Sequence, residues 1–220
     1  MTNEAEALAQ RYQDRVRDLG HVASRLREEF ESLLEDQAGI ERVEFRVKAV
    51  ESFVTKAMSS SEGKRRYASP LEEIEDQVGV RVMALFKSTI DEVLPKLTTR
   101  FATVESLRKQ PRVTSFGYES HHLVFQIPPE AYPPGWANRE DKIETFEVQV
   151  RTLFMHAWAE VNHDLGYKGG VLTEDQEREL AWAAASAWGA DNAFDRVRAS
   201  IAQRRDGAAG PHHKKRPTRF

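Results

Sequence analysis

One segment constrains the fold of this chain more than any other, because it joins an alternating run directly to a helical one. Residues 146–151 alternate apolar and polar side chains, which predicts a half-buried strand, and residues 152–165 have helical spacing. The apolar side chains of the strand must face the core, so the polar ones project together from the opposite face. These are a carboxylate, an amide and a guanidinium: Glu147, Gln149 and Arg151. Such a row indicates a site, although a solvated sheet face gives the same pattern on an isolated strand.

Two further predicted strands also begin with polar groups. Residues 76–81 lead into one apolar run, and residues 117–122 lead into another at 123–127. Three strands that each start with polar side chains favour a shared site over three unrelated solvated faces.

A fourth segment carries positive charge and a hydroxyl group. Residues 43–47 alternate like a strand, and the helical spacing that follows brings Lys48, Ser52 and Lys56 into line. Ammonium groups and hydroxyls bind the oxygens of polyphosphates, although a solvated helix face with lysines has the same pattern.

The remaining pattern predicts strands interspersed with helices, and hence an α+β domain. Residues 5–34 have the apolar spacing of one long amphipathic helix. Ser69 and Pro70 predict the start of a short helix that ends near Asp76. Further helices are expected at 48–58, 89–100, 152–165 and 173–204, and further strands at 78–86, 103–107 and 122–127. The helix from 152 is expected to stop at Gly166, and the chain from Gly207 onward is expected to be disordered.

Composition limits the classes of protein to consider. A chain of 220 residues can bury one good core, and its net charge of −3 gives no overall attraction to nucleic acid. It contains no cysteine, which excludes disulfides and thiolate zinc sites. No apolar stretch is long enough to span a bilayer, and the acidic N-terminal segment is unlike a signal peptide. We therefore expect a cytoplasmic protein without a membrane partner.

Several motifs, in this order and spacing, resemble the synthetase domain of the RelA/SpoT family, which makes the alarmones guanosine tetra- and pentaphosphate. They are Asp76-x-x-Gly79-x-Arg81, Gly117-Tyr118-x-Ser120-x-His122, Glu147-x-Gln149-x-Arg151-Thr152, Trp158-Ala159-Glu160 and Tyr167-Lys168. The resemblance covers roughly residues 42–168 and implies a nucleotidyltransferase-like mixed sheet flanked by helices. The chain length is similar to that of a small stand-alone synthetase. We expect an N-terminal helix (1–38), the synthetase domain (39–170), a C-terminal helical extension (171–206) and a basic tail (207–220).

The resemblance implies a GTP pyrophosphokinase of the stringent response. Such an enzyme transfers the β,γ-pyrophosphate of ATP to the ribose 3′-hydroxyl of GDP or GTP and releases AMP. Asp76 and Glu147 match the family's catalytic acids and would bind Mg²⁺, a cation that prefers hard oxygen ligands. The resemblance also assigns an ATP site to Arg46, Lys48, Ser52, Lys56 and Arg81. It assigns acceptor-nucleotide binding to Tyr118, Ser120, His122, Gln149 and Arg151.

Two departures from the family pattern leave the acceptor open. Glu119 stands where many members carry a basic or neutral residue, and residues 114–116 lack the lysine often found there. An alternative is therefore a toxic variant of the synthetase that acts on adenine nucleotides or on the 3′ end of tRNA. The basic tail at 212–216 is compatible with RNA binding, but short basic tails commonly serve solubility.

Two alternatives come from other classes of protein. His156, Glu160 and His163 lie at helical spacing, so a zinc hydrolase is conceivable, although this is not the usual two-histidine arrangement. The long terminal helices are also compatible with a non-catalytic oligomeric nucleotide-binding module. Small members of the family resemble homotetramers, so a homo-oligomer is expected in either case.

Overall fold

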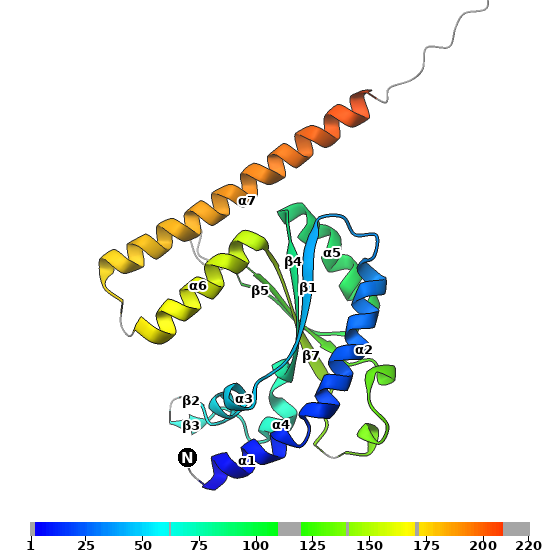
Figure 1. Ribbon diagram of the computed structural model, residues 1–220, viewed down its shortest axis with the longest axis vertical. Helices are drawn as coiled ribbons and strands as arrows, with labels where there is room; N and C mark the ends of the chain where they lie inside the picture. Colours follow the sequence, from blue (N-terminus) through cyan, green and yellow to red (C-terminus); the bar gives the residue numbers. More distant parts are fainter. Residues whose placement is uncertain (1–2, 62, 110–119, 140, 170–171, 209–220) are drawn as a thin grey trace, which may run out of the picture.

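A five-stranded mixed sheet forms the centre of the molecule (Figure 1). The computed structural model describes residues 3–61, 63–109, 120–139, 141–169 and 172–208. The strand order is β1-β4-β7-β6-β5, in which β4 and β7 run parallel and the other neighbours are antiparallel. The strands are β1 (Ile40–Val47), β4 (Val78–Ala84), β5 (Thr103–Lys109), β6 (Ser120–Gln126) and β7 (Thr145–Thr152). The predicted α+β class with a mixed sheet is confirmed.

Helices flank this sheet, and α2 runs across one of its faces (Figure 1). The helices are α1 (Asn3–Gln13), α2 (Val16–Leu34), α3 (Val50–Ala57), α4 (Pro70–Glu73), α5 (Lys87–Arg100), α6 (Leu153–Gly169) and α7 (Glu174–Ala208). The long helix α7 packs against α6 and α5 and extends past the sheet. In the described part of the chain, no helix combines the length and apolar composition that a bilayer span requires.

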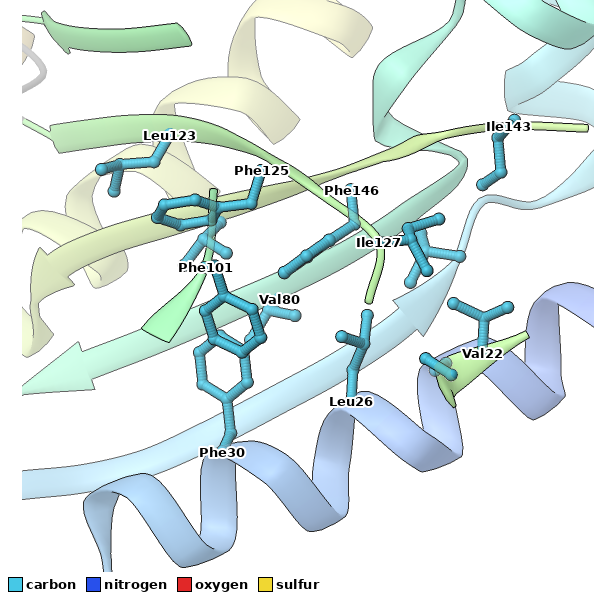
Figure 2. Close-up of a cluster of buried hydrophobic side chains, with 14 of the residues drawn as sticks. Val22, Leu26, Phe30, Val80, Phe101, Leu123, Phe125, Ile127, Ile143 and Phe146 are labelled. Carbon is cyan, nitrogen blue, oxygen red and sulfur yellow. The ribbon is translucent and has the colours of Figure 1, made fainter. Parts of the chain in front are cut away.

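The core lies between α2 and the sheet (Figure 2). Four apolar residues of α2 at helical spacing are fully buried, namely Leu19, Val22, Leu26 and Phe30. The alternate apolar residues of β7 are fully buried as well. Phe30 of α2 packs its ring within 5.3 Å of Phe101, 5.6 Å of Phe45 and 6.4 Å of Phe146, centroid to centroid. Because this face of β7 is buried, its polar residues project from the other face, as the alternation predicted.

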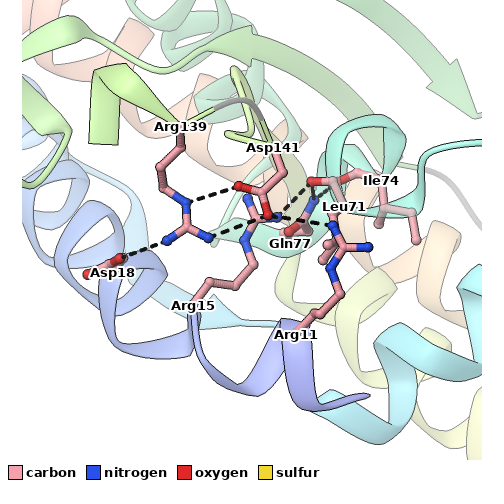
Figure 3. Close-up of polar contacts among 8 residues, drawn as sticks. All are labelled: Arg11, Arg15, Asp18, Leu71, Ile74, Gln77, Arg139 and Asp141. Atoms are coloured by element: carbon pink, nitrogen blue, oxygen red, sulfur yellow. Dashed lines mark hydrogen bonds and ion pairs between the residues drawn. The ribbon is translucent and has the colours of Figure 1, made fainter. Parts of the chain in front are cut away.

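The predicted single N-terminal helix is wrong, because the chain breaks between α1 and α2. At the break Arg15 has φ −103° and ψ −6°, and its side chain is fully buried. Its guanidinium donates to the carbonyl of Leu71 at 3.1 Å (Figure 3). A charged side chain that turns into the protein cannot be recognised from amphipathic spacing alone.

Other boundaries differ in smaller ways. The helix expected to stop at Gly166 continues to Gly169. A two-stranded hairpin, β2 (Ser60–Ser61) and β3 (Lys64–Arg65), occupies a segment for which no helix or strand was predicted. The last helix continues past residue 204, through 208. The tail was expected to be disordered from Gly207, but residues 207 and 208 belong to α7. Residues from 209 onward lie outside the described chain, so the expectation stays a prediction for them.

Candidate active site

The sheet register brings two distant carboxylates to the same edge of the sheet. Asp76 lies in a short 3₁₀ turn, η1 (Glu75–Gln77), that leads directly into β4. Glu147 lies near the start of β7, where it pairs with Gly79 in the parallel register. Parallel neighbours start at the same edge, so the two acids lie at the same edge of the sheet although 70 residues separate them.

Asp76 is held by two lysines. Lys48 Nζ lies 2.7 Å from Oδ2, and Lys56 Nζ lies 3.0 Å from Oδ1. Burial raises the pKa of Asp76, but the hydrogen bonds and charges of the two ammonium groups outweigh it and hold that pKa below its usual range. Asp76 is therefore ionised at neutral pH.

Glu147 is held by neighbours on its own face of the sheet. His122 of β6 places Nδ1 2.8 Å from Oε1, and Gln149 donates through Nε2 to Oε2 at 3.0 Å. Burial raises the pKa of Glu147, but the hydrogen bonds from His122 and Gln149 outweigh it. The pKa of Glu147 therefore lies below its usual value. Because an ionised carboxylate only accepts, Nδ1 of His122 is the donor in this pair.

An open cleft of about 770 Å³ lies beside these acids. Its size suits a nucleotide, since ligand pockets commonly span roughly 300–1,000 Å³. Six of the predicted site residues line it: Arg46, Lys48, Ser52, Arg81, His122 and Arg151. Lys56, Asp76, Glu147 and Gln149 join this group through the contacts given above.

Two predicted residues are not placed at this cleft. Ser120 is buried and lines a separate small cavity together with Lys87 and Asp191. Tyr118 lies outside the described residues, as does Glu119.

Glu160 of α6 lines the cleft; the sequence placed it in the Trp158-Ala159-Glu160 motif but gave it no role among the site residues. Its Oε1 lies 3.2 Å from a guanidinium nitrogen of Arg81 and 3.0 Å from one of Arg151. Burial raises the pKa of Glu160, and the positive charge of Arg81 with the hydrogen bond from Arg151 reverses that and lowers it. The Trp158-Ala159-Glu160 motif was the available signal, but only the structure shows which groups it contacts.

The zinc alternative receives no support from the described residues. They contain no group of three or more His, Asp or Glu side chains placed to hold one metal ion. Glu160 instead has the two arginines as its partners, and His156 Nδ1 lies 3.8 Å from its carboxylate.

Gly79 makes room for an arginine of the cleft. A Cβ atom at this position would lie 3.3 Å from Nε and 3.5 Å from Cγ of Arg46, which crosses over it from β1. The side chain of Arg46 thus occupies the space that a side chain at position 79 would need.

A mixed sheet that carries paired ionised carboxylates beside a cleft rich in arginine and lysine defines a protein that binds polyphosphorylated ligands. The chain belongs to the RelA/SpoT family. Residues 45–171 match the family model described as the region found in RelA / SpoT proteins.

Named relatives and solved structures agree with this assignment. The chain is 33% identical over 173 residues, 76% of each chain, to the GTP pyrophosphokinase YjbM of Bacillus subtilis (strain 168). It is 30% identical over 154 residues to the GTP pyrophosphokinase YwaC of the same organism, covering 68% of this chain and 67% of that one. The crystal structure of small alarmone synthetase 1 from Bacillus subtilis superposes with a TM-score of 0.67 at 29% identity, over 91% of this chain and 99% of that one. The same enzyme bound to its product pppGpp gives a TM-score of 0.66 at 27% identity, over 87% and 97%.

Proposed function

We propose that this chain is a GTP pyrophosphokinase. It transfers the β,γ-pyrophosphate of ATP to the ribose 3′-hydroxyl of GDP or GTP, makes (p)ppGpp and releases AMP. The observation that carries the proposal is the placement of Asp76 and Glu147 at the same edge of the sheet, beside a cation-lined cleft. Its two curated relatives named above are GTP pyrophosphokinases.

The donor side binds ATP through cations. Lys48, Ser52 and Lys56 bind the polyphosphate, while Arg46 and Arg81 offer flat guanidinium groups to the adenine ring. In the structure Lys48 and Lys56 both contact Asp76, so the ammonium groups that would bind the phosphates are held beside this carboxylate.

The residues present fit a magnesium ion. Asp76 and Glu147 are both ionised, supply hard oxygens and lie at the same edge of the sheet. Substrate phosphates and water would complete the coordination. When bound, the cation neutralises charge on the transferring pyrophosphate.

The acceptor side orients the 3′-hydroxyl. Glu147 accepts the proton of that hydroxyl, and the hydrogen bonds from His122 and Gln149 fix the direction of its carboxylate. Arg151 binds phosphate, and Tyr118 completes the acceptor site in this proposal. Ser120 has no direct role in it, because its side chain lines the separate cavity described above.

The test is the separation of products from radiolabelled ATP incubated with Mg²⁺ and, in turn, GDP, GTP, AMP and bulk tRNA. Label in a guanosine tetra- or pentaphosphate, with an equal amount of AMP, supports the proposal. Label only in an adenosine product or in tRNA identifies the toxic variant, and no AMP release with any acceptor identifies a binding module.

Replacing Gly79 by Ala tests the donor side. The added methyl group must displace Arg46 by a few tenths of an ångström, so we expect the KM for ATP to rise roughly two- to fivefold, equivalent to less than about 1 kcal/mol. The KM for the acceptor should stay unchanged. Gly20→Ala is the matched control, since a Cβ at that helical glycine meets nothing within 4 Å. Wild-type kinetics for Gly79→Ala would contradict this role of the glycine.

We also propose that the protein is a homo-oligomer assembled through α7. This helix exposes a series of large apolar side chains to solvent: Trp182, Trp188, Phe194, Val197 and Ile201. Light scattering after size exclusion should give a multiple of 25.1 kDa. Val197→Asp should shift the measured mass toward that of a single chain. A wild-type protein with the mass of a single chain would contradict the assembly.

A further inference from the structure

The junction between α1 and α2 contacts the elements that carry the donor side of the cleft, and it lies outside the segment that defines the family. The family match begins at residue 45, whereas this junction lies at residues 12–16. We infer that Tyr12 and Arg15 are positioning residues, which set Lys48 and Asp76 for the donor phosphates. The inference rests on the proposed function and adds residues to it that the family match does not cover.

Tyr12 fixes the backbone of Lys48. Its hydroxyl donates to the carbonyl of Lys48 at 2.9 Å, and its fully buried ring stacks on Phe53 of α3 with centroids 3.9 Å apart and planes within 5°. The amide nitrogen of Lys48 donates to the carbonyl of Gln77 at 2.9 Å. Both backbone polar groups of Lys48 are thus held, and its side chain extends from a fixed point to Asp76.

Arg15 fixes the turn that carries Asp76. It donates to the carbonyl of Leu71, and the buried amide of Gln77 donates to that same carbonyl and to the carbonyl of Ile74, both at 2.9 Å (Figure 3). Gln77 directly follows Asp76, so the turn is anchored on either side of the carboxylate.

The guanidinium of Arg15 is itself held in place. It lies 3.8 Å from a carboxylate oxygen of Asp141 and 5.3 Å from the centre of the Trp136 ring. Arg139 contacts the same carboxylate at 3.0 Å and lies 3.9 Å from Asp18 of α2 (Figure 3). The junction is therefore a rigid support and not a loose connection.

The flexible side chain of Lys48 gains from this support. A lysine side chain loses considerable rotamer entropy when it is held in one geometry, and less is lost on binding when its backbone is already fixed. Release of the Lys48 backbone should therefore weaken binding of the donor phosphates while leaving the acceptor site unaffected.

Tyr12→Phe removes only the hydroxyl and keeps the stacked ring. Because one such hydrogen bond has a modest net value, we expect the KM for ATP to rise roughly two- to tenfold, with the KM for GDP unchanged. The dissociation constant of a non-hydrolysable ATP analogue, measured by calorimetry with Mg²⁺, should rise by the same factor. Arg15→Lys should act in the same direction.

Tyr132→Phe is the matched control, because the Tyr132 hydroxyl also donates to a backbone carbonyl, that of Ile143 at 3.1 Å. It should lower the melting temperature about as much as Tyr12→Phe and leave both KM values unchanged. Unaltered analogue binding in Tyr12→Phe, or equal effects in the two variants, would overturn the inference. Since the analogue needs no turnover, a wild-type protein that binds it but forms no AMP would count against the proposed function alone.

Discussion

Glu147→Gln is expected to lower kcat for pyrophosphate transfer by about a thousandfold, within the range that general base catalysis contributes. The amide cannot take the proton of the 3′-hydroxyl, and it supplies a neutral oxygen where the proposed cation needs an anionic one. Turnover is measured as AMP released from ATP in the presence of GDP. The melting temperature should stay close to that of the wild type, because glutamine has the same shape and still accepts from His122.

Glu144→Gln is the control for this change. It makes the same chemical substitution three residues away, on a side chain that is 70% exposed and 3.6 Å from Lys142. It should leave kcat within about twofold of the wild type, because surface substitutions of this kind are nearly neutral. Substantial transfer activity in Glu147→Gln would remove this glutamate from the reaction.

Phe30→Ala is expected to lower the free energy of unfolding by about 3 to 5 kcal/mol, the usual cost of truncating a buried aromatic side chain. Phe30 is fully buried and contacts three other phenylalanine rings, which come from two strands and the end of α5 (Figure 2). Its loss leaves a cavity where α2 meets the sheet. Urea unfolding followed by circular dichroism measures the change.

Phe154→Ala is the comparison for this prediction. Phe154 is 38% exposed and stacks on Phe194 with ring centroids 5.7 Å apart. Its truncation therefore removes one ring contact and less buried surface than the truncation of Phe30. We expect its effect to be less than half that of Phe30→Ala. Equal effects would mean that the cluster around Phe30 does not dominate the core.

The sequence was sufficient where burial follows a simple period. The alternation in β7 predicted both its buried face and its polar row, and the helical spacing of α2 predicted the face that covers the sheet. Motif order and spacing were enough to indicate the family. These features depend on neighbours along the chain, which a sequence displays directly.

The sequence was insufficient where a contact depends on strand order. Asp76 pairs with Lys48 and Lys56 because β1 lies beside β4. No local pattern in the sequence reveals that these two strands are neighbours. The break at Arg15 was missed for a similar reason, since its partners come from residues 71 and 141. Gly79 is visible as a motif position, but the arginine that fills the space beside it comes from another strand.

The shared oxygen of Glu160 has a consequence for how the two nucleotides affect each other. In the proposed function Arg81 belongs to the donor side and Arg151 to the acceptor side, and both have this one carboxylate as a counter-ion. A nucleotide that draws either guanidinium toward itself changes the electrostatic environment of the other. Linkage then requires that each nucleotide alter the affinity of its companion by an identical factor, whichever arrives first.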